Sequence, residues 1–327
     1  MPTLITWNLP PGAASVAGND WLPVMLAKHL PDGAVVAAGA DPAGAPAFVA
    51  ARGALRDIPD QVLGAARVVV LLDPEEPERL RALRLLAGRA EARLVVVPSL
   101  ATIAAAEHTL LLILALARRL IPAYAELVAG AGHGTPPVPA LADGRPNWVG
   151  MAWPNLLAGR TLGIVGLGRV GEAVAARASA FGMRVLYHDR ERKPAAERRW
   201  GVQRQRFDQL LREADVISLH LPLTAETARI IDAPELALMR PAAYLINTAH
   251  GGLVDEGALL RALRQRAIAG AGLDVFAYEP IASDSPLLGL DNVVLTPHVG
   301  GVAPDTVRAD FARRAAAALL AHTPEAG

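Results

Sequence analysis

The chain has 327 residues, of which 52% are hydrophobic, which is enough for a large core and for two domains. Lysine and arginine total 32 and so do aspartate and glutamate, so the charge indicates neither a nucleic-acid partner nor a membrane partner. Cysteine is absent, which excludes disulfides, thiolate metal sites and thiol catalysis, and no metal site is predicted. The first residues lack the basic flank and apolar stretch of a signal peptide, so we expect a cytoplasmic protein.

The first 99 residues alternate short apolar runs with helical patterns. The predicted strands are 4–7, 34–38, 68–72 and 94–97, and the predicted helices are 21–30 and 77–86. The segment 40–47 is predicted to be a surface loop. Strands that alternate with helices predict a parallel sheet with crossover connections.

One long apolar helix is expected over residues 102–128, interrupted or ended near Pro122. Its longest apolar stretch, 109–117, is about half the length that a membrane span needs, so the helix is predicted to be fully buried, between domains or subunits. The Gly/Pro-rich stretch 129–148 follows it without periodicity. A loop of that length is typically functional or wraps a neighbouring subunit.

Residues 161–189 carry the strongest motif. A buried strand at 161–165 is predicted to lead into a G-x-G-x-x-G turn, followed by a helix at about 170–181 and a second strand at 183–188. Gly166 allows the sharp turn, Gly168 lets the backbone approach a pyrophosphate, and Gly171 lets helix and strand pack closely. The free N–H groups of the helix N-terminus favour phosphate binding.

Asp189 ends the second strand, at about the twenty-residue distance expected of the carboxylate that binds the ribose hydroxyls. Because this carboxylate would repel a 2′-phosphate, NAD is favoured over NADP as the cofactor. Arg190 beside it would soften that preference.

Beyond the dinucleotide motif, strands are expected at 216–221, 243–247, 270–275 and 293–296, with helices at 207–212, 233–239 and 256–264. Together these elements predict a doubly wound α/β sheet. A last helix, at about 304–321, is expected to pack back onto the first domain.

Ligands of such sheets bind outside the carboxyl ends of the strands, where the polar candidates are His220, His250, Asp274, Glu279 and His298. His298 directly follows the last strand. A neighbouring carboxylate, Glu279, would favour its imidazolium form, which makes His298 a proton donor in reduction and an acceptor in oxidation. The spacing alone leaves open that Glu279 is a solvated loop acid.

Several blocks in this order resemble the signature blocks of the D-isomer-specific 2-hydroxyacid dehydrogenases. The blocks are LGIVGLGRVGEAVA, ADVISLHLPLTAET, LINTAHGGLVDEGAL, AGLDVFAYEP and NVVLTPHVGG. AAAEHTLLLILALARR is similar to the long interdomain helix of that family. The resemblance implies an NAD-binding Rossmann domain, 100–299, inserted in a smaller, discontinuous, flavodoxin-like substrate domain made of 1–99 and 300–327. It also implies a homodimer built around the long helix and the loop after it.

The resemblance also assigns roles. His298 would be the catalytic histidine, Glu279 the acid paired with it, and Asp274 the aspartate at the nicotinamide end. The other implied cofactor contacts are Gly166, Gly168, Arg169, Val170, Gly171, Asp189, Arg190, Pro222, Thr227, Thr248, Ala249, Gly300 and Gly301.

One position departs from the family pattern. Where the family has an arginine that clamps the substrate carboxylate, this chain has His250, in the block 247–252. Histidine is shorter than arginine and mostly neutral at pH 7, so the clamp is weaker. Either His250 is a weaker, pH-sensitive anchor for a 2-oxo acid, or the substrate is recognised without a carboxylate fork. Formate and phosphite dehydrogenase relatives fit badly, because the former pair the histidine with glutamine and the latter keep the arginine.

A second departure lies in 68–80, where the family has a glycine-rich loop. Here the segment has four acidic residues and no glycine, so it would repel an anion unless these acids cap the next helix and face solvent. The sequence therefore predicts an NAD-dependent oxidoreductase for a small 2-hydroxy or 2-oxo acid or a related carbonyl. The alternatives are a dehydrogenase for a non-carboxylate substrate and an NAD(H)-sensing protein.

Overall fold

A computed structural model of the chain describes residues 100–131, 150–152 and 154–304, with residues 147 and 307. In the first hundred residues it also describes 4–5, 35–36, 48–52, 60, 68–72, 81–82, 84–87 and 93–97. The chain divides into two compact units, residues 1–104 with 301–327 and residues 105–300. The helix predicted at 21–30, the acidic stretch 73–80 and nearly all of the helix predicted at 304–321 lie outside the described residues.

The described part of the first unit is built from parallel strands. Strands β1 (Leu4–Ile5) and β2 (Val35–Val36) form one parallel pair. Strands β3 (Phe48–Arg52), β4 (Val68–Leu72) and β5 (Arg93–Val97) form a parallel sheet in the order β3-β4-β5. These strands confirm the predicted parallel α/β architecture, although β3 itself was not predicted.

The second unit contains a parallel sheet of seven strands in the order β12-β11-β10-β9-β6-β7-β8. The strands are β6 (Thr161–Val165), β7 (Arg184–His188), β8 (Gln203–Arg204), β9 (Val216–Leu219), β10 (Tyr244–Asn247), β11 (Gly270–Leu273) and β12 (Val293–Leu295). The chain order reverses between β6 and β9, which lie side by side. In a doubly wound sheet a dinucleotide binds at this switch point, outside the carboxyl ends of the strands.

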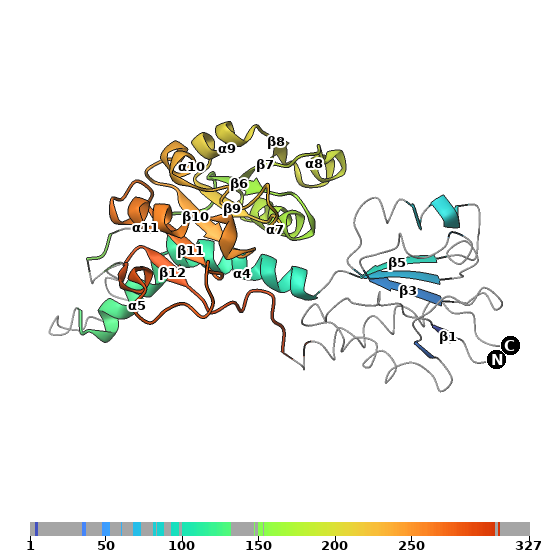
Figure 1. Cartoon of the computed structure of the whole chain (residues 1–327), viewed down its shortest axis with the longest axis horizontal. Helices are drawn as coiled ribbons and strands as arrows, with labels where there is room; N and C mark the ends of the chain where they lie inside the picture. The colour runs from blue at the N-terminus through green and yellow to red at the C-terminus, as the bar shows by residue number, and fades with distance from the viewer. Residues whose placement is uncertain are drawn as a thin grey trace, which may run out of the picture. The chain divides into compact units, whose positions relative to one another are not determined.

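Helices cover both faces of this sheet (Figure 1). They are α4 (Leu100–Ala117), α5 (Leu120–Val128), α7 (Arg169–Ala180), α8 (Pro194–Trp200), α9 (Phe207–Glu213), α10 (Ala233–Leu238) and α11 (Glu256–Arg264), with the 3-10 turns η2 (Gly251–Leu253) and η3 (Pro286–Gly289). The side chains of β6 alternate between two cores. Leu162 and Ile164 join the core with α4 and α7, whereas Val165 joins the core with α9, α10 and α11. This alternation is the period-two pattern of a buried strand.

The long helix predicted at 102–128 is broken, but not at Pro122. Arg119, with φ of 54°, separates α4 from α5 and leaves Pro122 in the first turn of α5. A proline is tolerated there because N–H groups of the first turn have no partner within the helix.

By length and composition, α4 could cross a membrane, yet 50% of it is buried. Its Leu112 and Leu116 side chains pack against Gly272 of β11, so α4 is a core helix of this unit. The prediction that this helix is buried on every side is wrong for this unit, because Leu111 is exposed.

Candidate active site at the carboxyl ends of the strands

The glycine-rich turn after β6 is shaped by close contacts. Gly166 has φ of 95°, and a Cβ there would lie 2.6 Å from the carbonyl oxygen of His220. A Cβ on Gly171 would lie 2.3 Å from the carbonyl oxygen of Gly166, so this residue allows α7 to pack on the turn. A Cβ on Gly168 would meet nothing within 4 Å, so the backbone there is open to a ligand. The turn at Gly166 and the close packing at Gly171 are those that the motif predicts, and the pyrophosphate contact at Gly168 stays a prediction.

The first turn of α7 provides N–H groups beside this opening. The helix begins at Arg169 and continues through Val170, and Gly168 caps it without a side-chain hydrogen bond. Asp189 follows β7 and accepts a hydrogen bond from the Leu167 amide at 2.9 Å, which places its carboxylate against the turn. An uncapped helix N-terminus, an open glycine and an adjacent carboxylate fit the pyrophosphate and ribose of a dinucleotide.

The segment that carries Asp189 is also held by residues that lie outside the glycine-rich turn. The Arg204 guanidinium donates to the carbonyl oxygens of Asp189 and Arg190 at 3.0 and 2.9 Å. Tyr187 is fully buried, accepts a hydrogen bond from the Lys193 amide and donates to Glu197, each at 2.8 Å. The Arg190 side chain is exposed.

The segment after β9 holds the residues predicted on the adenine side. The Thr227 hydroxyl donates to the carbonyl oxygen of Pro222 at 2.6 Å, which closes this turn. His220 lies at the end of β9, 2.8 Å from the Ser218 hydroxyl, and burial lowers its pKa to about 4. His220 is therefore neutral at pH 7, whereas His298 lies beside a carboxylate.

His298 and Glu279 form a close pair. Nδ1 of His298 lies 2.6 Å from Oε2 of Glu279, and the other carboxylate oxygen accepts the Phe276 amide at 3.0 Å. Burial opposes ionisation of Glu279, but the His298 hydrogen bond, the Phe276 amide and the charge of His298 outweigh it, so the pKa of Glu279 is lowered. The His298 side chain is 60% exposed, which leaves Nε2 available to a substrate.

The backbone at His298 is strained and firmly held. Its φ of 54° is left-handed, which costs a non-glycine residue roughly 1–3 kcal/mol. Its amide donates to the main-chain carbonyl oxygen of Asp274 at 2.9 Å. The next two amides, of Val299 and Gly300, donate to the Asp274 carboxylate at 2.9 and 2.7 Å. Asp274 is 1% exposed, and its three hydrogen bonds to these amides fix the loop that carries His298.

These contacts bear on the cofactor roles predicted for three residues. The Asp274 carboxylate accepts hydrogen bonds from the loop after β12, so its nicotinamide contact stays a prediction. A Cβ on Gly300 would lie 2.7 Å from Oδ2 of Asp274, so Gly300 permits this packing. Gly301 is exposed, with open space where its Cβ would be.

The loop after β10 carries His250. Asn247, buried at the end of β10, donates to the His250 carbonyl oxygen at 2.8 Å and accepts the Ala249 amide at 3.1 Å. The Thr248 hydroxyl lies 2.8 Å from that of Thr109 in α4. His250 itself is exposed, and among the described residues its ring has no hydrogen-bond partner.

Gly251 joins the His250 loop to the loop after β11. A Cβ on Gly251 would lie only 1.8 Å from the carbonyl oxygen of Phe276, so the two loops touch backbone to backbone. The Phe276 amide binds Glu279. The structure thus brings the predicted acid–base pair and the predicted substrate residue onto adjoining loops.

Sequence reasoning missed two site residues, Thr296 and His108. The Thr296 hydroxyl donates to Asp274 at 2.6 Å, and Nε2 of His108 lies 2.8 Å from the same hydroxyl. The available signal was a histidine inside an apolar helix, because a buried imidazole needs a polar partner. In the described part of the chain, no group of three or more His, Cys, Asp or Glu could hold a metal ion.

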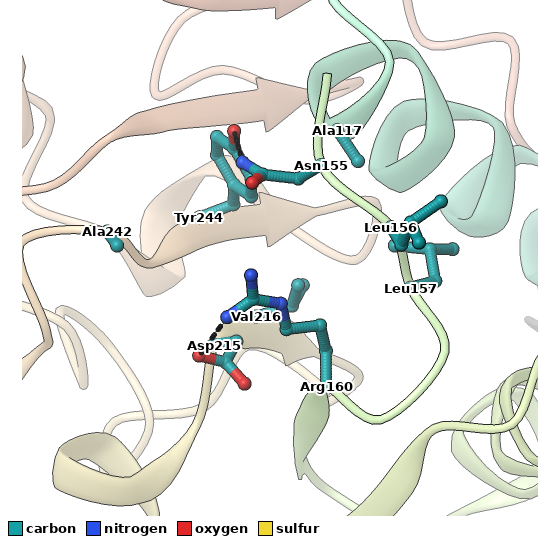
Figure 2. Close-up of a pocket in the computed structure, with 9 residues that line it drawn as sticks. All are labelled: Ala117, Asn155, Leu156, Leu157, Arg160, Asp215, Val216, Ala242 and Tyr244. Atoms are coloured by element: carbon teal, nitrogen blue, oxygen red, sulfur yellow. Dashed lines mark hydrogen bonds and ion pairs between the residues drawn. The ribbon is translucent and has the colours of Figure 1, made fainter. Parts of the chain in front are cut away.

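A small hollow lies at the opposite edge of the sheet, where the strands begin (Figure 2). Its volume is about 40 Å³. Asp215 binds the Thr161 amide and Arg240, at 2.9 and 2.8 Å, and Arg160 lies 3.9 Å away. These contacts tie the starts of β6 and β9 together.

Comparison with known proteins agrees with the fold and the motif. Residues 110–300 match the family model described as "D-isomer specific 2-hydroxyacid dehydrogenase, NAD binding domain". A glyoxylate reductase of Thermococcus litoralis is 46% identical over 207 residues, which span 62% of this chain but only 59% of that relative.

Two solved structures are also similar. The TT0316 protein of Thermus thermophilus has a TM-score of 0.56 and 36% identity, and the match covers 91% of this chain and 85% of that protein. D-lactate dehydrogenase of Aquifex aeolicus, complexed with NAD and lactic acid, has a TM-score of 0.55 and 27% identity. The match covers 81% of this chain and 85% of that enzyme.

Proposed function

The chain belongs to the D-isomer specific 2-hydroxyacid dehydrogenase family, and we propose that it is an NAD(H)-dependent oxidoreductase that interconverts a small 2-oxo acid and its 2-hydroxy acid. The observation that carries this proposal is the 2.6 Å pair of His298 and Glu279, at the same edge of the sheet as the glycine turn. An imidazole paired with a carboxylate is suited to general acid–base work near neutral pH.

The cofactor is held by the glycine turn and its surroundings. The amides of Arg169 and Val170 bind the pyrophosphate, and Asp189 binds the ribose hydroxyls, where it disfavours a 2′-phosphate. Thr248, Ala249 and the loop after β12 would hold the rest of the cofactor. When bound, NADH supplies the hydride that reduces the carbonyl carbon.

His298 supplies the proton. Because Glu279 occupies Nδ1 of the imidazole, Nε2 is the nitrogen left for the substrate oxygen. Protonated His298 gives its Nε2 proton to the carbonyl oxygen as the carbon accepts the hydride, and in oxidation the neutral ring takes that proton back. Glu279 holds the ring in one orientation and stabilises its charged form.

Glyoxylate is the first substrate to test, because three relatives that are 43–50% identical to this chain bear the name glyoxylate reductase. His250 stands where the family has an arginine that binds the substrate carboxylate. A histidine there is a weaker anchor, and its exposed ring is free among the described residues to contact a substrate.

A substrate panel tests this role of His250. NADH oxidation is measured for the wild type and His250→Arg with glyoxylate, other 2-oxo acids and neutral α-dicarbonyls. If His250 is a weakened clamp, the arginine variant lowers KM for the acids by about tenfold or more, as a charged hydrogen bond would. An unchanged KM contradicts the proposed role of His250, and turnover of neutral carbonyls alone contradicts an acid as the substrate.

Catalytic cycling tests the activity itself. An enzyme consumes many equivalents of NADH in the presence of a 2-oxo acid, whereas a sensor on the same fold binds NADH stoichiometrically and consumes almost none. Binding without cycling across the whole panel would overturn the proposal in favour of an NAD(H)-sensing protein.

We also propose that the protein is a cytoplasmic homodimer. Helix α5 has no buried residue, and apolar side chains are exposed along it: Leu120, Ile121, Tyr124, Leu127 and Val128. A contiguous apolar surface of this kind is typical of a subunit interface.

A further inference from the structure

His108 is a nearly buried polar side chain in the largely apolar helix α4. Its side chain is only 11% exposed, and its Nε2 atom faces two oxygen atoms. The Thr296 hydroxyl lies at 2.8 Å and Oδ1 of Asp274 at 3.3 Å. All three residues belong to the second unit.

The donors and acceptors in this cluster can be assigned. The Thr296 hydroxyl has one proton, and its 2.6 Å contact with Oδ1 of Asp274 uses that proton, because an ionised carboxylate can only accept. The hydroxyl oxygen must therefore accept from His108. Nε2 of His108 carries a proton, and the chain of donors runs from His108 through Thr296 to Asp274.

Asp274 transmits this chain to the acid–base residue. Its main-chain carbonyl binds the His298 amide, and its carboxylate binds the next two amides, of Val299 and Gly300. Gly300 is packed against both groups, because a Cβ there would lie 2.7 Å from the Asp274 carboxylate and 3.3 Å from the His108 ring. A substitution at His108 would therefore alter the contacts that position the loop carrying His298.

We propose that His108 is a positioning residue for the proposed reaction: through Thr296 and Asp274 it holds the loop on which His298 presents its imidazole to the substrate. The inference rests on the proposed role of His298 in acid–base chemistry. The buried Asp274 carboxylate, which accepts hydrogen bonds from Thr296, Val299 and Gly300, links His108 to this loop. In this proposal His108 does not contact the substrate itself.

The first experiment compares two substitutions of similar size. His108→Gln places an amide N–H near the position of Nε2, whereas His108→Leu removes the donor. We expect kcat for glyoxylate reduction to fall about tenfold to a hundredfold in His108→Leu, as for other small displacements of catalytic groups, and to recover substantially in His108→Gln. Glu107→Gln, an exposed change on the same helix turn, is the control.

A double substitution separates positioning from general structural damage. If His108 acts through His298, His108→Leu lowers kcat in the wild type but changes it less than about twofold in a His298→Ala background. An equal loss of kcat in both backgrounds, or no loss in the wild type, would overturn the proposal.

NMR spectroscopy tests the inference independently of the proposed activity. The Val299 and Gly300 amides donate to a carboxylate, and their proton signals should shift in His108→Leu and return toward wild-type positions in His108→Gln. Unchanged signals would refute the positioning chain even if the enzyme is active. Shifted signals in a protein that never turns over NADH would instead refute the proposed function and leave the contact chain established.

Discussion

Two histidines that each follow a strand of the seven-stranded sheet differ because of their surroundings. His220 follows β9 and is kept neutral by burial, with a pKa of about 4, whereas His298 follows β12 and lies against the Glu279 carboxylate. The sequence placed both residues at strand ends, but it could not separate their environments. Glu279 binds the Phe276 amide as well as His298, so it is a structured partner and not the solvated loop acid that its spacing had left possible.

The lowered pKa of Glu279 predicts how turnover depends on pH. Its carboxylate is ionised at neutral pH, and the contact with His298 is lost only as the pH falls through its pKa, below the usual 4.5. At pH 7, Glu279→Gln should lower kcat by about tenfold to a hundredfold, and the acid-side decline due to this carboxylate should disappear. Steady-state rates of NADH oxidation from pH 4 upward provide the test.

Glu256→Gln is the matched control, because this carboxylate also accepts an amide from the same loop, that of Ala277, at 3.1 Å, but binds no histidine in the described structure. Its pH profile should match the wild type. A Glu279→Gln variant with wild-type kcat would contradict the role given to the pair.

At the scale of elements, the sequence predicted those with a strong pattern and missed those without one. The glycine turn and its strands were found because buried strands and special glycines leave clear signals. Strand β3 was missed because its alanines are poor strand formers, and α8 was missed because seven residues show little periodicity. His108 and Thr296 are 188 positions apart, so local patterns could not pair them.

Contact between the loops after β10 and β11 gives a prediction at this scale. In Gly251→Ala the new Cβ would clash with the backbone of Phe276, which a side-chain rotation cannot relieve. We expect a loss of about 1–3 kcal/mol in the free energy of unfolding and a lower kcat, because the displaced loop also carries Glu279. Urea unfolding and NADH oxidation measure the two effects.

Gly289→Ala is the control for that substitution. A Cβ at Gly289 would meet nothing within 4 Å, and its backbone does not have a positive φ, so stability and kcat should be nearly unchanged. If Gly251→Ala and Gly289→Ala changed the free energy of unfolding and kcat equally, the contact between the two loops would not be the cause of either loss.

At the scale of the whole molecule, one side of the second unit is unusually apolar. Helix α5 exposes Tyr124 by 68% and Ile121 by 52%. The proposed dimer would bury these side chains. The sequence suggested this surface through a long apolar helix interrupted near Pro122, and the break lies a few residues earlier, at Arg119, whose left-handed conformation leaves no local signal.

Charge substitutions on this helix test the dimer. Ile121→Glu combined with Tyr124→Glu should convert the protein to a monomer in analytical ultracentrifugation, because two charges would be buried in an apolar interface. Leu288→Glu, on the equally exposed η3 turn, should leave the assembly unchanged. A wild-type protein that sediments as a monomer would contradict the proposed dimer.

The most direct measurement is NADH oxidation with glyoxylate by the wild type and by His298→Ala, with NADH affinity determined in parallel by fluorescence titration. We predict that the wild type turns over and that the variant loses about 10²–10⁴-fold in kcat while its Kd for NADH is nearly unchanged, since His298 is not part of the glycine-turn site. Retained turnover in His298→Ala would contradict acid–base chemistry at the His298–Glu279 pair.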